Sequence, residues 1–266
     1  MILFLTIYVQ VVTSQTLLDV CLEARGRNVN LALLMPTHPS AHEMQSRTIN
    51  MMQTLFDGPF GLTKIPTTIV KESHLNADVL SGFDHVLPIG ISPGYSSSGQ
   101  LIAVAIADDQ HCVLVEFNVS GPRRARGNNI PPNRNEEGLK LLQQILCRTA
   151  GDLIAFDMGP LTMSLYCDAN RLRVNNAVDV QSGVSAVDRK PLTVIKAIIG
   201  TDVPIKEKNV VGIFRHPEYK TTDRNVSAAE LAMRAWVSQV LSSYGNGAET
   251  LAKVPRISTL DLKEEV

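Results

Sequence analysis

The sequence predicts an α/β protein built on a mixed β-sheet. Three short apolar segments rich in Val and Ile follow one another between residues 85 and 118: HVLPIGI, LIAVAIA and CVLVEFN. A loop rich in Gly and Ser and a tight Ala-Asp-Asp-Gln turn separate them, which is typical of consecutive strands. Beyond them, helical and strand patterns alternate, as in a sheet flanked by helices. With 44% apolar and 19% charged residues, the chain has the composition of a globular protein.

Before these strands, we expect an N-terminal helical extension over residues 1–62. Residues 16–24 and 41–56 have helical spacing, and Ser40 is placed to cap the second helix with Glu43 three residues on. Residues 66–91 then predict a short strand, a helix and the first long strand. The Met-rich face of 41–56 favours core packing over a ligand surface.

After the three strands, the pattern predicts a loop, a helix and further alternating elements. Residues 120–135 have the composition of a loop, and Asn135 caps a helix over 136–150 whose first turn is acidic. We expect a strand at 153–156, a helix around 161–166, a strand-like segment over 174–179, a helix over 191–200 and a helix over 227–243 that starts with a Ser227–Glu230 capping box. The predicted domains are an extension at 1–62, an α/β domain at 63–245 and a mobile polar tail at 246–266.

The charge of the chain argues against a dedicated nucleic-acid binder. The net charge is −1 and the pI about 6.6, so any contact with RNA or DNA must come from a local patch. The candidate patch is Arg123, Arg124 and Arg126 in the long loop, with Arg134 nearby. The alternative is a solvated surface loop, since no aromatic residues stand between the arginines for base stacking.

Cysteines and histidines give no motif for a metal site. Cys21, Cys112, Cys147 and Cys167 show no C-x-x-C spacing, and we expect buried free thiols in a reducing compartment. His38 and His42 are four residues apart, but Pro39 between them interrupts a helical face.

The apolar run at residues 2–12 permits two interpretations. It is too short for a membrane-spanning helix, and no basic residue precedes it as in a signal peptide. We therefore expect a buried element and a cytoplasmic or nuclear protein without membrane contact. The alternative is a secreted protein, in which Asn118 and Asn225, each starting an Asn-Val-Ser triplet, would be glycosylation acceptors.

From about Thr67 to Tyr244 the chain resembles the DEDD superfamily of 3′–5′ exonucleases, in its DnaQ, RNase D and Werner-like branches. The resemblance implies a ribonuclease-H-like fold. In that family the first long strand carries an Asp-x-Glu pair, whereas Gly90 and Ser92 stand at these positions here. The second motif places Leu161 where an Asp is expected, and the third places Arg234 where its Asp is expected.

These replacements imply that catalysis has been lost. Two-metal cleavage of a phosphodiester needs several carboxylates around the ions, and the four replaced positions supply one hydroxyl and one positive charge. We therefore expect no metal, no cofactor and no catalytic residue. The fallback is a divergent enzyme in a shifted frame that binds Mg²⁺ or Mn²⁺ through Glu116, Asp157 and Asp179.

Three functions remain open at this stage. The first is an inactive exonuclease-like domain that acts as an adaptor in an RNA or DNA pathway, through a protein partner or a homodimer. The second is a module that binds RNA or DNA without catalysis. The third is the divergent metal-dependent 3′–5′ exonuclease.

Overall fold

The computed structural model describes residues 46–58, 63–118, 135–169, 171–185, 188–215, 218–220 and 222–262. The predictions for residues 2–12, 16–24 and Ser40–Glu43, for Cys21, and for the loop arginines Arg123, Arg124, Arg126 and Arg134 lie outside these residues. Within the described residues the strands are β1 (Ser46–Met52), β2 (Lys64–Lys71), β3 (Ile89–Tyr95), β4 (Leu101–Ala107), β5 (Cys112–Glu116), β6 (Leu153–Ala155) and β7 (Ala177–Asp179). The helices are η3 (Glu72–His74), α2 (Ala77–Leu80), α3 (Glu136–Leu146), α4 (Met158–Cys167), η4 (Val180–Gly183), α5 (Pro191–Ile199), α6 (Glu207–Arg215), α7 (Arg224–Ser243) and α8 (Gly247–Ala252).

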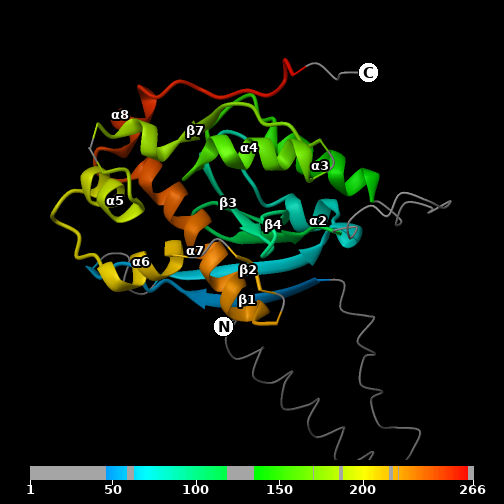
Figure 1. Ribbon diagram of the computed structural model, residues 1–266, viewed down its shortest axis with the longest axis horizontal. Coiled ribbons are helices and arrows are strands. Elements are labelled where there is room, and N and C mark those ends of the chain that lie inside the picture. The colour runs from blue at the N-terminus through cyan, green and yellow to red at the C-terminus, as the bar shows by residue number, and fades with distance from the viewer. Residues whose placement is uncertain are drawn as a thin grey trace, which may run out of the picture. The chain divides into compact units, whose positions relative to one another are not determined.

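The strands form one mixed sheet in the order β1-β2-β5-β4-β3-β6-β7 (Figure 1). β3, β4 and β5 are antiparallel neighbours, and β6 and β7 continue the sheet in parallel beside β3. On the other side, β2 runs parallel to β5 and β1 antiparallel to β2. This meander followed by parallel strands, with helices flanking the sheet, confirms the predicted ribonuclease-H-like α/β fold.

The helix predicted over residues 41–56 is wrong where the structure describes it, because residues 46–52 form strand β1. Ile49 and Met51 are two residues apart and both pack toward the core, which is strand spacing. Thr48 and Thr68 face each other across the pair and share a hydrogen bond of 2.8 Å. The edge of β2 supplies backbone partners that override the helical spacing of the apolar residues.

Helix α7 packs against one face of the sheet, where β3 and β4 carry small residues (Figure 1). On β3 this face carries Gly90, Ser92 and Gly94, and their partners on β4 are alanines: Ala107, Ala105 and Ala103. A Cβ atom added to Gly90 would lie 1.9 Å from the carbonyl oxygen of Ala235 on α7. The helix therefore approaches β3 more closely than any side chain at position 90 would allow.

Larger side chains fill the opposite face. A second core cluster there contains Ile89, Ile91, Val104 and Ile106 of β3 and β4 together with residues of α3 and α4. Leu142 and Leu146 come from α3, and Leu161 and Leu165 come from α4. Because side chains of a strand alternate between faces, the same two strands serve a tight helix contact on one side and a bulky core on the other.

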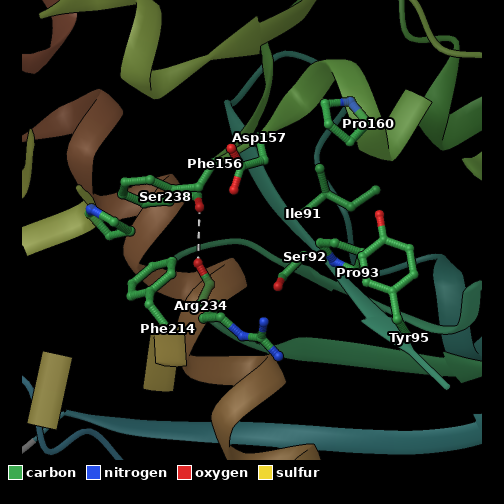
Figure 2. Close-up of a pocket in the computed structure, with 11 residues that line it drawn as sticks. Ile91, Ser92, Pro93, Tyr95, Phe156, Asp157, Pro160, Phe214, Arg234 and Ser238 are labelled. Atoms are coloured by element: carbon green, nitrogen blue, oxygen red, sulfur yellow. Dashed lines mark hydrogen bonds between the residues drawn. The ribbon is translucent and has the colours of Figure 1, made fainter. Parts of the chain in front are cut away.

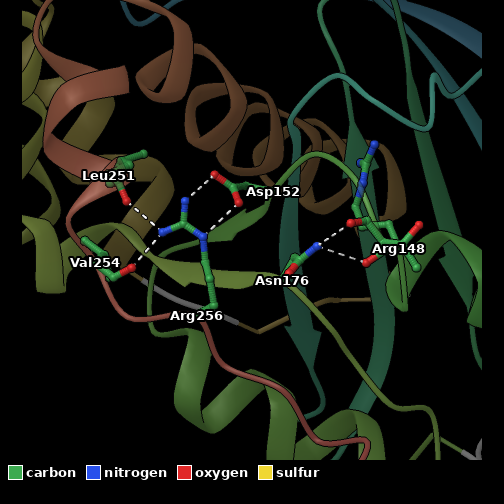
Figure 3. Close-up of polar contacts among 7 residues, drawn as sticks. Arg148, Asp152, Asn176, Leu251, Val254 and Arg256 are labelled. Carbon is green, nitrogen blue, oxygen red and sulfur yellow. Dashed lines mark hydrogen bonds and ion pairs between the residues drawn. The ribbon is translucent and has the colours of Figure 1, made fainter.

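The C-terminal segment differs from the predicted mobile tail. Residues 247–252 form α8, and Ile257 exchanges two backbone hydrogen bonds with Ala177 of β7. Arg256 forms a two-pronged ion pair with Asp152 just before β6, at 2.9 Å for each nitrogen–oxygen contact (Figure 3). The polar composition of this segment reflects its ion pairs rather than a lack of packing.

Two further elements differ from the prediction. The sequence pattern predicts no element between residues 200 and 227, whereas helix α6 covers 207–215 and buries Val210 and Ile213. Helix α7 begins three residues before Ser227, so Ser227 does not cap it; its hydroxyl accepts a hydrogen bond from the Lys220 backbone N–H instead. No helix within the described ranges is long and apolar enough to cross a membrane.

Candidate functional site

A pocket of about 330 Å³ lies where β3 meets α7 and the start of α4 (Figure 2). Strand β3 contributes Ser92, Pro93 and Tyr95, and α7 contributes Arg234 and Ser238. The remaining wall comes from the end of β6 and from α4, α5 and α6: Phe156, Asp157, Pro160, Pro191 and Phe214. Phe156 and Phe214 pack edge to face, with their ring centres 4.7 Å apart. The pocket thus combines one buried cation and one carboxylate with a mainly apolar lining.

The structure brings together three of the four positions that the resemblance marks as replaced acids. Ser92 and Arg234 both line the pocket, and Gly90 lies two residues before Ser92 on the same face of β3. Leu161 does not join them, because its side chain is fully buried in the core beneath α4. The side chain that this segment sends into the pocket is Asp157, four residues earlier.

Asp157 occupies the first position before α4 in the left-handed region, with φ of 54°. Its backbone N–H donates to the Gln181 side-chain oxygen at 2.8 Å, and its carboxylate faces the pocket (Figure 2). Burial raises the pKa of Asp157, and the charge of Asp179 raises it further. Two fallback acids are therefore near enough to repel each other.

Asp179 is already engaged by the backbone beside it. Its carboxylate accepts from the Gln181 N–H at 3.1 Å and from the Ser182 hydroxyl at 2.9 Å, which caps η4. An aspartate at such a cap stabilises the first turn of the helix that follows it. A local structural role thus accounts for both of its oxygens.

The third fallback acid, Glu116, belongs to a separate cluster. It accepts a hydrogen bond from the Tyr219 hydroxyl at 2.5 Å and forms an ion pair with the Nε and Nη2 atoms of the Arg224 guanidinium. Burial and the bound carboxylate raise the pKa of Tyr219. Glu116 is not among the residues that line the pocket. It therefore holds the start of α7 to β5, and the structure does not unite it with Asp157 and Asp179.

Arg234 is the most unusual side chain of the pocket. It is 6% exposed, and its Nε has no hydrogen-bond partner among the described residues. Burial lowers the pKa of Arg234 to about 10, so the guanidinium is still charged at neutral pH. Burying a charge without an ion pair lowers the stability of a folded protein, so Arg234 differs from a side chain that only packs in the core.

The pocket residues do not fit a two-metal centre. Such a centre needs several hard oxygen ligands around its ions, and the pocket offers the Asp157 carboxylate, the Ser92 hydroxyl and a guanidinium. Within the described ranges, no group of three or more His, Cys, Asp and Glu side chains is placed to hold a metal ion. A cation bound beside Arg234 would also meet its positive charge at close range.

Sequence reasoning found Ser92, Arg234 and Asp157 but missed the aromatic wall. Tyr95, Phe156 and Phe214 come from three different elements, and only the fold brings them to one pocket. Burial raises the pKa of Tyr95, whose hydroxyl accepts a hydrogen bond from Ser164 at 3.4 Å. Among the cysteines, Cys112 is a buried free thiol as predicted, whereas Cys147 is half-buried and Cys167 exposed.

Comparison with known proteins yields similarity in structure only. No protein-family model matches the chain, and no curated protein matches it in sequence. Two solved structures of RNase D from Trypanosoma brucei are similar to this chain. The structure of RNase D is 16% identical in sequence, with a TM-score of 0.42. The structure of its complex with GMP is 15% identical, with a TM-score of 0.40. Each match covers 66% of this chain. It covers 64% of the RNase D chain and 56% of the chain in the GMP complex, which is less than two thirds of either.

Proposed function

We propose that this chain is a 3′–5′ exonuclease-like domain without catalytic activity, and that it acts as an adaptor in an RNA or DNA pathway through contacts with a protein partner or a second copy. Its fold provides a scaffold that can persist after the chemistry is lost, since activity depends on the site rather than on the fold. No metal or other cofactor is required by this function.

The observation that carries the proposal is the position of Arg234. Its buried guanidinium lines the pocket beside Ser92, where catalysis by metal ions would call for carboxylates. A fixed positive charge raises the free energy of any cation placed near it, most strongly where water is excluded. Asp157 supplies one carboxylate to the pocket, and one carboxylate is not enough to bind two metal ions.

The packing of Gly90 supports the same conclusion. An aspartate there would place its Cβ 1.9 Å from the Ala235 carbonyl oxygen and 2.7 Å from the Gln239 backbone nitrogen. Both contacts are with the backbone of α7, which cannot rotate away as a flexible side chain would. The first acid of the family motif therefore has no room unless α7 moves.

The divergent-exonuclease alternative has weaker support, because Glu116 is held by Arg224 and Tyr219 away from the pocket. Labelled single-stranded RNA and DNA, incubated with the wild-type chain and Mg²⁺ or Mn²⁺, test it directly. We expect no shortening beyond that given by a D157N variant. Processive loss of 3′ nucleotides that D157N abolishes would overturn the proposed function.

The adaptor role needs a separate experiment. A tagged chain recovered from cells is treated with nuclease before its bound proteins are identified. We expect a specific protein to stay bound, or light scattering to show a homodimer. Loss of every protein upon nuclease treatment, together with a monomeric mass, would contradict contacts through protein.

The second candidate function is direct binding of RNA or DNA without catalysis, through Arg123, Arg124 and Arg126. Replacing all three with alanine reduces the slope of log affinity against log salt if they contact phosphates. An unchanged slope and affinity would eliminate this loop as the binding element.

A further inference from the structure

Helices α6 and α7 lie side by side and leave an open groove of about 530 Å³ between them (Figure 1). Lys208 and Gly212 line it on the α6 side. Val226, Ala229 and Glu230 line it on the α7 side. Each set lies on one side of its helix, because residues three or four apart are neighbours on a helix surface. The groove shares no lining residue with the pocket between β3, α7 and the start of α4, so it is a separate feature of the molecule.

The groove offers apolar surface to a second molecule. Val226 is 59% exposed at its rim, and Val211, the residue before Gly212 on α6, is 46% exposed. A Cβ atom added to Gly212 would meet no atom within 4 Å, so the chain leaves this space unfilled, although glycine weakens the middle of a helix relative to alanine. Exposed apolar side chains beside a hollow are typical of a protein interface.

The two sides of the groove carry opposite charges, Lys208 on α6 and Glu230 on α7. Neither side chain forms an ion pair with another described residue, whereas Glu207, the neighbour of Lys208, pairs with Lys196 at 2.5 Å. Glu230 acts on Arg234, one helical turn further on, only as a nearby charge. A surface with a cation on one side and an anion on the other is complementary to a rotated copy of itself.

We propose that this groove is the contact between two copies of the chain, related by a twofold axis that runs along the groove. Such an axis sets α6 of one copy against α7 of the other, so that Lys208 of each copy faces the partner's Glu230. The same rotation brings Val226 onto the outer side of the partner's α6, where Gly212 leaves room and Val211 adds apolar contact. The charges set the orientation of the two copies, and the valines exclude water from the contact. This inference rests on the proposed function, because it names a second copy as the protein partner and the surface that binds it.

Sedimentation velocity of the full chain at several concentrations tests this inference. We expect the mass to rise from that of the 29.0 kDa chain toward twice this value as the concentration approaches about 100 μM, because contacts between two helix faces are smaller than those of obligate dimers. V226D should weaken the dimer about tenfold or more, since it places a charge against the apolar surface of the partner. V86D is the matched control and should leave the dimer unchanged, because Val86 is 66% exposed in the loop before β3. A monomeric mass at every concentration would overturn the inference, as would a dimer that V226D leaves intact.

Charge reversal tests the orientation of the two copies. K208E and E230K should each weaken the dimer several-fold, because each sets like charges opposite one another at both ends of the contact. The double variant K208E/E230K should recover most of the lost affinity, since opposite charges then face each other again. Circular dichroism shows whether each variant is folded. Single variants without effect, or a double variant that does not recover, would overturn the twofold arrangement.

Filling the groove tests the contact in a variant whose fold is preserved. G212L adds a side chain where the chain itself has no atom within 4 Å, and leucine favours a helix, so only the partner should be displaced. G159L in α4 also meets no atom within 4 Å and should leave the dimer unchanged. Equal dimerisation of G212L and the wild-type chain would overturn the proposal.

The tagged chain recovered from cells distinguishes the second copy from another occupant of the groove. A wild-type chain that stays monomeric while V226D loses a different bound protein would overturn the second copy as the partner. Nuclease activity would overturn the proposed function without changing the sedimenting mass, so the two failures are distinguishable.

Discussion

Two buried arginines of this protein have nearly the same exposure and opposite surroundings. Arg148 is 5% exposed and Arg234 is 6% exposed. Arg148 donates to three backbone carbonyls, those of Ala150 at 2.9 Å and of Asp84 and Leu87 at 2.7 Å each. Arg234 lines a pocket, and its Nε finds no hydrogen-bond partner in the part of the chain that the structure describes. Burial alone therefore does not distinguish the two arginines; the supply of hydrogen-bond acceptors does.

The surroundings of Arg148 are rich in hydrogen bonds. Asn176 donates to the carbonyls of Arg148 and Thr149, and Arg256 pairs with Asp152 and with the carbonyls of Leu251 and Val254 (Figure 3). Burial lowers the pKa of Arg148, while the charges of Asp84 and Asp152 favour its protonated form. This region joins the end of α3 to the segment before β3, and backbone carbonyls engage both Nε and Nη2 of Arg148.

The largest effect is expected for R148M. The substitution removes all three donors and leaves three carbonyl oxygens without them, which should lower the free energy of unfolding by about 3 kcal/mol. Urea denaturation followed by circular dichroism measures the loss, with R215M as the exposed control. A loss below about 1 kcal/mol would show that water replaces the guanidinium, and the contrast with Arg234 would disappear.

A second prediction concerns the close contact of α7, the helix that carries Arg234. G90A places a Cβ against the α7 backbone and should cost about 2 kcal/mol through overpacking. G159A in α4 is the matched control, because a Cβ there meets nothing within 4 Å and alanine favours the helix. Equal stabilities of the two variants would mean that α7 shifts freely over β3.

For Arg234 itself we expect little loss of stability. R234M removes a buried charge that forms no ion pair among the described residues and keeps a long apolar side chain, so the free energy of unfolding should stay constant or rise by about 1 kcal/mol. The same urea experiment compares it with R148M. A loss as large as that of R148M would identify Arg234 as a structural residue and break the comparison.

The smallest effect is a pH dependence at the other end of the pocket. The pKa of Asp157 is raised in the folded state, so its ionisation opposes folding above the folded-state pKa and has no effect below the unfolded value of about 3.9. D157N should therefore raise Tm at pH 7 and leave it unchanged at pH 3. Thermal melts at both pH values check this. A gain of equal size at both would trace to packing rather than to charge.

The sequence was sufficient for the central strands and most of the helices, because their apolar runs and turns are local signals. It was insufficient for β1, whose Met and Ile spacing is compatible with a helix until the edge of β2 is present. At the site, Gly90, Ser92 and Arg234, which the resemblance compares with catalytic acids, lie near one another where β3 meets α7. The resemblance also implies that Leu161 lies beside them. In the structure, Asp157 precedes α4 in a left-handed conformation, and the Leu161 side chain of α4 packs in the core. Such a backbone turn has no clear signature in one sequence.

The C-terminal segment has a consequence for how the protein behaves in solution. β7 is an edge strand of the sheet. The backbone N–H and C=O groups of an uncovered edge strand can pair with strands of other molecules. Ile257 occupies both backbone groups of Ala177, and Thr259 bonds the backbone of Val174 just before the strand. Ile257 and Thr259 thus form a shield over the start of this outer strand, and we expect it to hinder pairing with other molecules. Shortening the protein from this end would remove the shield, so an affinity tag is best added without deletion of these residues.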